Sequence, residues 1–510
     1  MATKTSNEQP SASLDTAAQV LPPQSNVAKA EKKLAQVEQE FGPDHEMTFH
    51  AVHILALQYA DQAEYPKAEE LYQRALQGYE KINSPNSTAA LDLKHDLGNL
   101  YNRIGKFQEA EAIFLSVLEG SEKALGPEDK STLQTLCSLG SLYLLAKRFD
   151  ECEKVYLRAL QGQEKILGPD SAHTLQTVDN IGILYLKLGR LAEAEKMCQR
   201  ALLGMVKTLG QDDPSTFTTA VHLADIYDEQ GKLHEAETLY LRALEGQAKF
   251  LGPDHRSTLQ TVHSLCGVYL QLRKLSDAEE MCLRALHGYE KILPPTHSLI
   301  LTSISNLGII YENQDKLAEA EETYLRALDL KEKAYGKDDL STLTTVKNMT
   351  GLYYKRNKLQ EADAACRRAV EGLGKLLGNE HPQTLGAVTN LGNICMGQDK
   401  LGEAKDLYSS VLEILDRTLG VEQTRTYIPY LDTLQNLGSV YQKQGDLDAA
   451  EAAYSKALDG YQAVFGSNHA TSQRITWRLL LLRSGDADCG PGAGGSAAAA
   501  AASTNNAMVG

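Results

Sequence analysis

The small and apolar side chains of this chain recur with a period of 42 residues. One small residue per period marks the register: Ala56, Gly98, Gly140, Gly182, Ala224, Cys266, Gly308, Thr350, Gly392 and, after a step of 46, Gly438. A tyrosine follows three positions later in all but one period, and a second small residue, usually alanine, follows twelve positions after the first. Each small residue lies on an apolar stripe with spacings of three and four, as on one face of a helix. Each period therefore predicts two closely packed α-helices and no strand.

A second series of residues punctuates the predicted helices. Eight glycines are separated by multiples of 42 residues. They are Gly42, Gly126, Gly168, Gly210, Gly252, Gly336, Gly378 and Gly420, and the two missing steps of the series hold Ser84 and Pro294. Glycine just past a helix end readily takes the left-handed conformation, so the series predicts the C-terminal cap of the second helix in each period. The spacing of Ser131 and Gln134, repeated at Ser257 and Gln260, predicts a capping box at the start of the first helix.

The repeat divides the chain into five segments. Residues 1–26 are polar and contain few large apolar groups, which predicts a disordered N-terminal tail. We expect residues 27–44 to form an N-terminal half unit and residues 45–466 to form ten two-helix units. Residues 467–483 then predict a C-terminal capping helix, since half units commonly cap an open stack. Residues 484–510 are rich in glycine and alanine and predict a second disordered tail.

The order of small residue, tyrosine, alanine and a later Ala-Leu pair resembles the tetratricopeptide repeat. The Ala-Leu pair stands at Ala159-Leu160, Ala243-Leu244 and Ala327-Leu328. The usual period of that family is about 34 residues. The longer form, with its Leu-Gly-Pro-Asp-His link from Leu251 to His255, is similar to the repeats of kinesin light chains and to the repeat regions of fungal and bacterial nucleotide-dependent sensor proteins. The resemblance covers residues 45–466 and implies an all-α fold, a right-handed α-solenoid of helix-turn-helix units with terminal half units.

Charge and composition narrow the class of function. The chain has 67 acidic and 51 basic side chains and a net charge of −16 at pH 7, so we expect no nucleic-acid partner. No apolar run reaches transmembrane length and no signal-peptide core occurs, so we expect no membrane insertion and a cytoplasmic location. The eight cysteines form no Cys-x-x-Cys pair, which favours reduced core thiols over disulfides or a metal site. We expect no cofactor.

Motifs that carry catalytic chemistry are absent or out of context. The glycines from Gly490 to Gly495 match a dinucleotide loop in spacing only, because no strand precedes them. His45 and His50 are five residues apart, whereas two zinc ligands on one helical face need a spacing of four. We therefore expect no enzyme activity. Five histidines share one register of the linker, and we interpret them as solvated residues: His45, His255, His297, His381 and His469.

The resemblance also suggests a binding surface. In tetratricopeptide proteins the concave groove that holds an extended peptide is lined by four positions of each first helix: three before, two before, one after and five after the small residue. Kinesin light chains place an asparagine two before the small residue, where its amide can donate to and accept from a peptide backbone. The resemblance assigns the peptide-binding groove of this chain to Asn180, Asn306, Asn348, Asn390, Asn436, Lys187 and Lys355. The lysine and asparagine arrangement that clamps a C-terminal carboxylate in chaperone-binding relatives is not reproduced.

These features favour a non-catalytic scaffold or adaptor that binds a protein or peptide segment in the groove. A kinesin light chain-like cargo adaptor is a narrower alternative, although only the segment Val27–Phe41 is available as a counterpart of that family's long coiled coil. A rival hypothesis is that the chain is the sensor part of a nucleotide-driven signalling ATPase that lacks its NTPase domain. A third is self-association through the apolar C-terminal helix that contains Ile475, Trp477 and Leu479 to Leu482.

Overall fold

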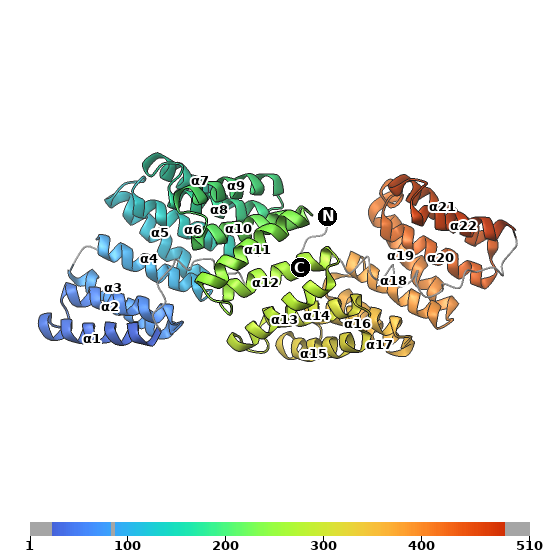
Figure 1. Ribbon diagram of the computed structural model, residues 1–510, viewed down its shortest axis with the longest axis horizontal. Coiled ribbons are helices and arrows are strands. Elements are labelled where there is room, and N and C mark those ends of the chain that lie inside the picture. Colours follow the sequence, from blue (N-terminus) through green and yellow to red (C-terminus); the bar gives the residue numbers. More distant parts are fainter. Residues whose placement is uncertain (1–22, 83–86, 485–510) are drawn as a thin grey trace. The chain divides into compact units, whose positions relative to one another are not determined.

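The computed structural model describes residues 23–82 and 87–484, and every regular element within those ranges is a helix. Ten hairpins follow one another between two single helices, α1 (Pro23–Phe41) and α22 (Ala470–Ser484) (Figure 1). The first helix of each hairpin, helix A, is α2 (Glu46–Asp61), α4 (Thr88–Arg103), α6 (Lys130–Leu145), α8 (Ala172–Lys187), α10 (Pro214–Glu229), α12 (Arg256–Gln271), α14 (Ser298–Asn313), α16 (Leu340–Lys355), α18 (Pro382–Gly397) and α20 (Ile428–Gln444). The second, helix B, is α3 (Tyr65–Ile82), α5 (Phe107–Ala124), α7 (Phe149–Ile166), α9 (Leu191–Thr208), α11 (Leu233–Phe250), α13 (Leu275–Ile292), α15 (Leu317–Tyr335), α17 (Leu359–Leu377), α19 (Leu401–Thr424) and α21 (Leu447–Phe465). The all-α repeat of helix hairpins is confirmed.

The chain forms two compact bodies, which meet in sequence inside α12. The first body comprises residues 1–264 and the second residues 265–510. Helix α1 begins at Pro23, before the expected start of the half unit at residue 27. Apart from the residues at the ends of α1 and α22, the two predicted tails lie outside the part of the chain that the structure describes. None of the described helices is both long and apolar enough to cross a membrane.

The residue that caps the start of helix A lies earlier than the sequence suggested. Asp129, not Ser131, is the N-cap of α6, and its carboxylate accepts a hydrogen bond from the Ser131 backbone N–H at 2.9 Å. The capping-box prediction is therefore wrong. The linker histidines have the same role as Asp129: His297 and His381 each accept through Nδ1 from the backbone N–H two residues later, at 3.2 Å. They satisfy helix N–H groups that would otherwise lack a partner, a capping role beyond the solvated linker residues expected from the sequence.

The glycine series ends each helix B, but with a backbone geometry other than the left-handed helical one. Gly336 has φ 92° and ψ 169°, and Gly378 has φ 91° and ψ 158°. This region is open essentially to glycine alone. Except at Gly420, the carbonyl of each glycine in the series also accepts a hydrogen bond from a threonine six residues later, as from Thr174 to Gly168 at 2.8 Å. The glycine thus both turns the chain and ties the linker to the next helix A.

The small residue of helix A makes room for a large side chain of helix B. A Cβ placed on Gly140 would lie 2.4 Å from the ring of Tyr156, which is fully buried. Cysteine takes the aromatic position in some units, and the seven described cysteines are free thiols. Burial raises the pKa of Cys152 to about 12, so this thiol stays protonated. The prediction of reduced core cysteines is confirmed for the described residues.

Neighbouring units are joined by a cluster of three side chains that we call the Tyr-Glu-cation clasp. In the clasp of α5 and α6, the Tyr143 hydroxyl donates to Glu111 at 3.0 Å, and Arg148 donates to the same carboxylate at 2.7 Å. The Arg148 guanidinium also lies 4.5 Å from the centre of the Tyr143 ring. Burial and the carboxylate together raise the pKa of Tyr143 to about 12. The conserved spacing of the tyrosines therefore reflects contacts between units as well as core packing within them.

Candidate peptide-binding surface

The predicted binding residues fall on one stripe of helix A, which we call the helix-A stripe. It comprises the residues three before, two before, one after and five after each small residue. The five predicted asparagines each lie two before the small residue, on α8, α14, α16, α18 and α20. Asn348 is buried, whereas Asn180, Asn306, Asn390 and Asn436 are half-buried. Half-buried amides at a regular spacing can bind a peptide backbone only where their own hydrogen-bonding groups are free.

One predicted asparagine already has a partner in the neighbouring unit. The Asn436 amide donates to the side-chain oxygen of Asn393 at 3.0 Å. That oxygen also accepts from the Tyr408 hydroxyl at 2.6 Å. Asn393 stands one after the small residue, so the stripe positions of successive units bind one another directly. Asn436 therefore keeps only part of its hydrogen-bonding capacity for a ligand.

The predicted Lys355 is engaged in a pair that crosses from one unit to the next. Its ammonium lies 2.7 Å from Glu312 of α14, and the two side chains are 21% and 6% exposed. The Tyr324 hydroxyl donates to the same carboxylate at 3.2 Å. A carboxylate this deeply buried needs such partners, because an unpaired buried charge is costly. Lys355 therefore first serves to neutralise Glu312.

Lys347 is a stripe residue outside the set that the resemblance assigned to the groove. It stands three before the small residue on α16 and is half-buried. Burial lowers its pKa, and neither a hydrogen bond nor an ion pair of its ammonium is present among the described residues. One turn along the same helix is Gly351, where an added Cβ would meet nothing closer than a Glu312 oxygen at 3.9 Å. The α16 stripe thus combines a partly desolvated cation with open backbone.

In the first body the same stripe is satisfied internally. Asp179 is fully buried and lies 2.8 Å from His222 of the next helix A. Burial disfavours the charged imidazole, but Asp179 outweighs it, so the pKa of His222 lies above its usual value. The Tyr240 hydroxyl donates to Asp225, whose pKa is raised by burial. The predicted Lys187, at the end of α8, is exposed.

Two more histidines continue this polar ladder near the N-terminus. His53 lies 2.8 Å from Asp96, and His95 lies 2.9 Å from Ser138. Burial opposes ionisation of Asp96, but hydrogen bonds from both histidines lower its pKa to about 2. Each pair joins the residue three before the small position to the residue two before it in the next unit. This pairing between positions of neighbouring units is visible in the sequence only when consecutive periods are compared with each other.

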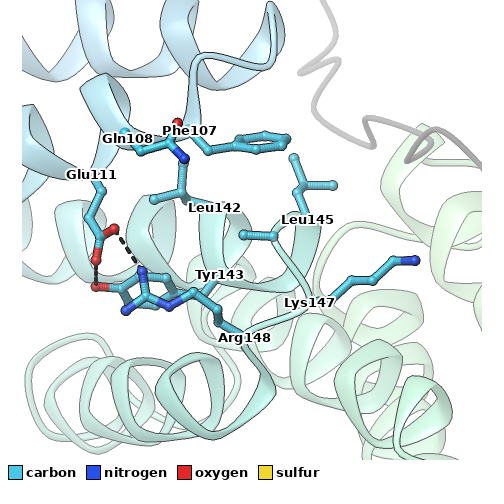
Figure 2. Close-up of a pocket in the computed structure, with 9 residues that line it drawn as sticks. Phe107, Gln108, Glu111, Leu142, Tyr143, Leu145, Lys147 and Arg148 are labelled. Carbon is cyan, nitrogen blue, oxygen red and sulfur yellow. Dashed lines mark hydrogen bonds and ion pairs between the residues drawn. The ribbon is translucent and has the colours of Figure 1, made fainter.

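One cavity lies where the end of α6 meets the start of α5, and its lining includes Leu145, the stripe residue five after Gly140. It has a volume of about 410 Å³ and is lined by Phe107, Gln108, Glu111, Leu142, Tyr143, Leu145, Ala146, Lys147 and Arg148. Figure 2 shows that the Glu111 carboxylate accepts hydrogen bonds from both Tyr143 and Arg148, so the cavity borders a Tyr-Glu-cation clasp. Glu111, Tyr143 and Arg148 already bond one another, so these polar groups of the cavity serve the joint between units.

Comparison with known proteins identifies the repeat. A family model described as tetratricopeptide repeat matches residues 47–123, 87–151, 131–202, 174–246, 215–291 and 299–373, and a second with the same description matches residues 431–471. No curated protein sequence matches the chain. The apo form of RapI is similar in structure, with a TM-score of 0.55 and 14% identity over 73% of this chain and 97% of RapI.

Two further solved structures are repeat proteins of the kinesin light chain type. A Podosopora anserina putative kinesin light chain with nearly identical TPR-like repeats is 25% identical, covers 41% of this chain and 98% of its own, and has a TM-score of 0.38. BtubC (BKLC) from P. vanneervenii is 22% identical, covers 46% and 94%, and has a TM-score of 0.39. The expected resemblance to the tetratricopeptide repeat is confirmed, since models of that family match most of the chain.

Proposed function

Because the chain belongs to the tetratricopeptide repeat family, we propose that it is a non-catalytic scaffold that binds a peptide or protein segment along the helix-A stripe. The fold presents many parallel copies of one helix face, which suits an extended ligand that meets one unit after another. The observation that carries the proposal is on α16, where the Lys347 ammonium has no hydrogen-bond or ion-pair partner within residues 23–82 and 87–484 and lies beside buried Asn348 and open Gly351. A group left partly desolvated and unpaired in the free protein gains most from a bound partner.

The second body supports this use of the stripe better than the first. In the first body, the Asp179–His222 pair already occupies the groups that would meet a ligand. In the second body Asn306 and Asn390 are half-buried stripe residues on either side of α16. We therefore place the binding segment on α14, α16 and α18, with Asn306, Asn348 and Asn390 holding the backbone of the ligand.

Affinity purification with the full chain tests the proposal. Partners recovered with the wild-type chain should be lost when Asn306, Asn348 and Asn390 are replaced together by alanine, since each substitution removes one donor and one acceptor. Gln161→Ala is the matched control, because Gln161 is an exposed amide on helix B of the first body. Thermal unfolding must show that both variants stay folded. Recovery of the same partners with the folded triple variant would refute stripe binding.

A sensor role, a cargo-adaptor role and self-association can each be tested by experiment. A sensor role beside a separate nucleotide-dependent ATPase makes the same prediction of no turnover, so nucleotide hydrolysis by the purified chain above buffer would refute both non-catalytic readings. A kinesin light chain-like cargo adaptor differs only in the partner recovered. Self-association through the C-terminal helix is tested by light scattering on a chain that ends at Gly466, where an unchanged mass would remove α22 as the contact.

A further inference from the structure

Helix α22 has the register of a helix A, no helix B follows it among the described residues, and its exposed face carries apolar side chains. His469 caps its start as the linker histidines cap other A helices, with the Thr471 backbone N–H donating to His469 Nδ1 at 3.2 Å. Its inner residues Ile475 and Leu479 are buried. Trp477 and Leu480 point outward and are 58% and 53% exposed. An exposed tryptophan beside an exposed leucine on one helix face indicates a contact surface.

The repeat shows what covers this face elsewhere. Leu480 stands one period after Gly438, so it occupies the small-residue position, and Trp477 stands three before it. In complete units that position touches the large residue of helix B, as Gly438 does with Tyr454, where an added Cβ would lie 2.9 Å from the ring. The residue three before touches the same side chain, as His95 does with Phe114 at 5.7 Å between ring centres.

At α22 the helix-A position that is small in complete units holds a large side chain. A complete unit pairs a small residue on helix A with a large one on helix B. Here helix A itself supplies the large residues Trp477 and Leu480, so a helix that fits the face must be small at the opposite position. In the sequence, residues 485–507 contain no large apolar side chain that could fill the rest of such a helix–helix contact.

Charge selects among the remaining occupants. Helix α22 contains three arginines and no acidic residue: Arg483 pairs with Glu451 of α21 at 2.8 Å, Arg478 donates to Ser439 of α20 at 3.2 Å, and Arg474, three residues before Trp477, is exposed. A second α22 would bring like charges together, which is unfavourable. The other single helix, α1, would bring Lys33 to the position that Ala75 fills in the next helix B, where a side chain is fully buried. A helix with acidic side chains complements the arginines, whereas a second copy of this chain does not.

We propose that α22 is the docking site for an amphipathic helix of a partner protein, which takes the place of helix B in the last unit. The partner helix places a small residue against Leu480, an apolar stripe against Trp477 and acidic residues near the arginines. This site is separate from the helix-A stripe of α14, α16 and α18. The helix-in-groove mode of recognition uses the same physics, an apolar helix face buried against another with charges at the rim.

Trp477 makes the proposal directly measurable, because it is the chain's single tryptophan. The probe is a synthetic peptide with the sequence of α15, residues 317–335, carrying Tyr324→Ala to provide the small position. Added to the full chain, it should blue-shift the emission of Trp477 and protect it from acrylamide quenching in a saturable way. A second peptide with Glu319, Glu321 and Glu322 changed to lysine should bind at least about tenfold more weakly, as expected for loss of charge complementarity.

Two variants of the chain complete the test. Leu480→Asp should weaken binding of the first peptide about tenfold or more, because it puts a charge into the apolar contact. Leu203→Asp is the matched control, since Leu203 is 72% exposed on α9 and should leave binding unchanged. Thermal unfolding verifies that both variants are folded.

Three results would overturn the proposal. The first is a Trp477 emission that the peptide does not change, or an affinity that neither Leu480→Asp nor charge reversal reduces. The second is a blue shift that appears with rising concentration of the chain alone, which would identify a second copy as the occupant. The third is emission that is already blue-shifted and moves to the red when residues 485–510 are removed, which would identify the chain's own C-terminal residues.

Discussion

Replacing Gly351 by alanine should stabilise the second body and weaken ligand binding at the same time. Gly351 lies inside helix α16, where glycine costs about 0.5–1 kcal/mol relative to alanine. The added Cβ meets only the Glu312 oxygen at 3.9 Å, an ordinary van der Waals distance, so no packing cost offsets the gain. The substitution should therefore raise the unfolding free energy by about 0.5–1 kcal/mol. Each kcal/mol corresponds to a rise of about 2–4 °C in Tm for a body of this size.

Adding a side chain at a packed glycine should change stability in the opposite direction. At Gly140 the Cβ alone would lie 2.4 Å from the buried Tyr156 ring. Gly140→Val should therefore lower stability by about 1–3 kcal/mol through overpacking. Urea denaturation followed by far-UV circular dichroism measures both changes. A Gly351→Ala variant no more stable than wild type would refute the view that this backbone is open, and one that binds recovered partners unchanged would refute close approach of a ligand there.

Three other changes probe the contacts between and within units. Lys355→Met should cost about 3 kcal/mol because it leaves Glu312 buried and unpaired, and adding Glu312→Gln should restore much of the loss in a urea titration. The pKa of His222 is raised, so the stability that its pair with Asp179 contributes is present at low pH and is lost as pH rises through the folded-state pKa. His222→Asn should therefore lower the unfolding free energy more near about pH 6 than near about pH 8 in thermal scans. An equal loss at both pH values would contradict the assignment. Thr174→Ala should cost about 1 kcal/mol in the same scans by removing the hydrogen bond to the Gly168 carbonyl, whereas no loss would show that the bond is dispensable.

The fold could be predicted from the sequence because it repeats. A residue such as Gly140 is ambiguous alone, but its return every 42 positions beside a tyrosine reveals a helix packed against a helix. The helix starts were misplaced for a local reason. Ser131 and Gln134 have the spacing of a capping box, yet the chain places Asp129 at the N-cap, and sequence spacing alone does not tell which of two acceptors in one turn meets the free N–H groups.

The binding surface was only partly predictable. The stripe register placed the asparagines and Lys355 correctly on helix A, but the Lys355–Glu312 pair joins residues 43 positions apart. Whether a polar side chain is free depends on the neighbouring unit, and a reading of one period at a time does not see it. Because Lys355 is paired with Glu312, Lys347 is the better candidate for binding a ligand; burial lowers its pKa, and no partner of its ammonium is present among the described residues.

The Tyr-Glu-cation clasp makes one period an exchangeable block of the gene. Removing residues 127–168 would join Gly126 to Pro169 and so restore the Gly-Pro pair that Gly126 forms with Pro127 in the native chain. Tyr185 and Arg190, which now meet Glu153, would then face Glu111 with the same chemistry. Where both joints of a period carry the clasp, loss or duplication of that period leaves the new joint chemically intact, so this part of the array can change length by copying whole periods.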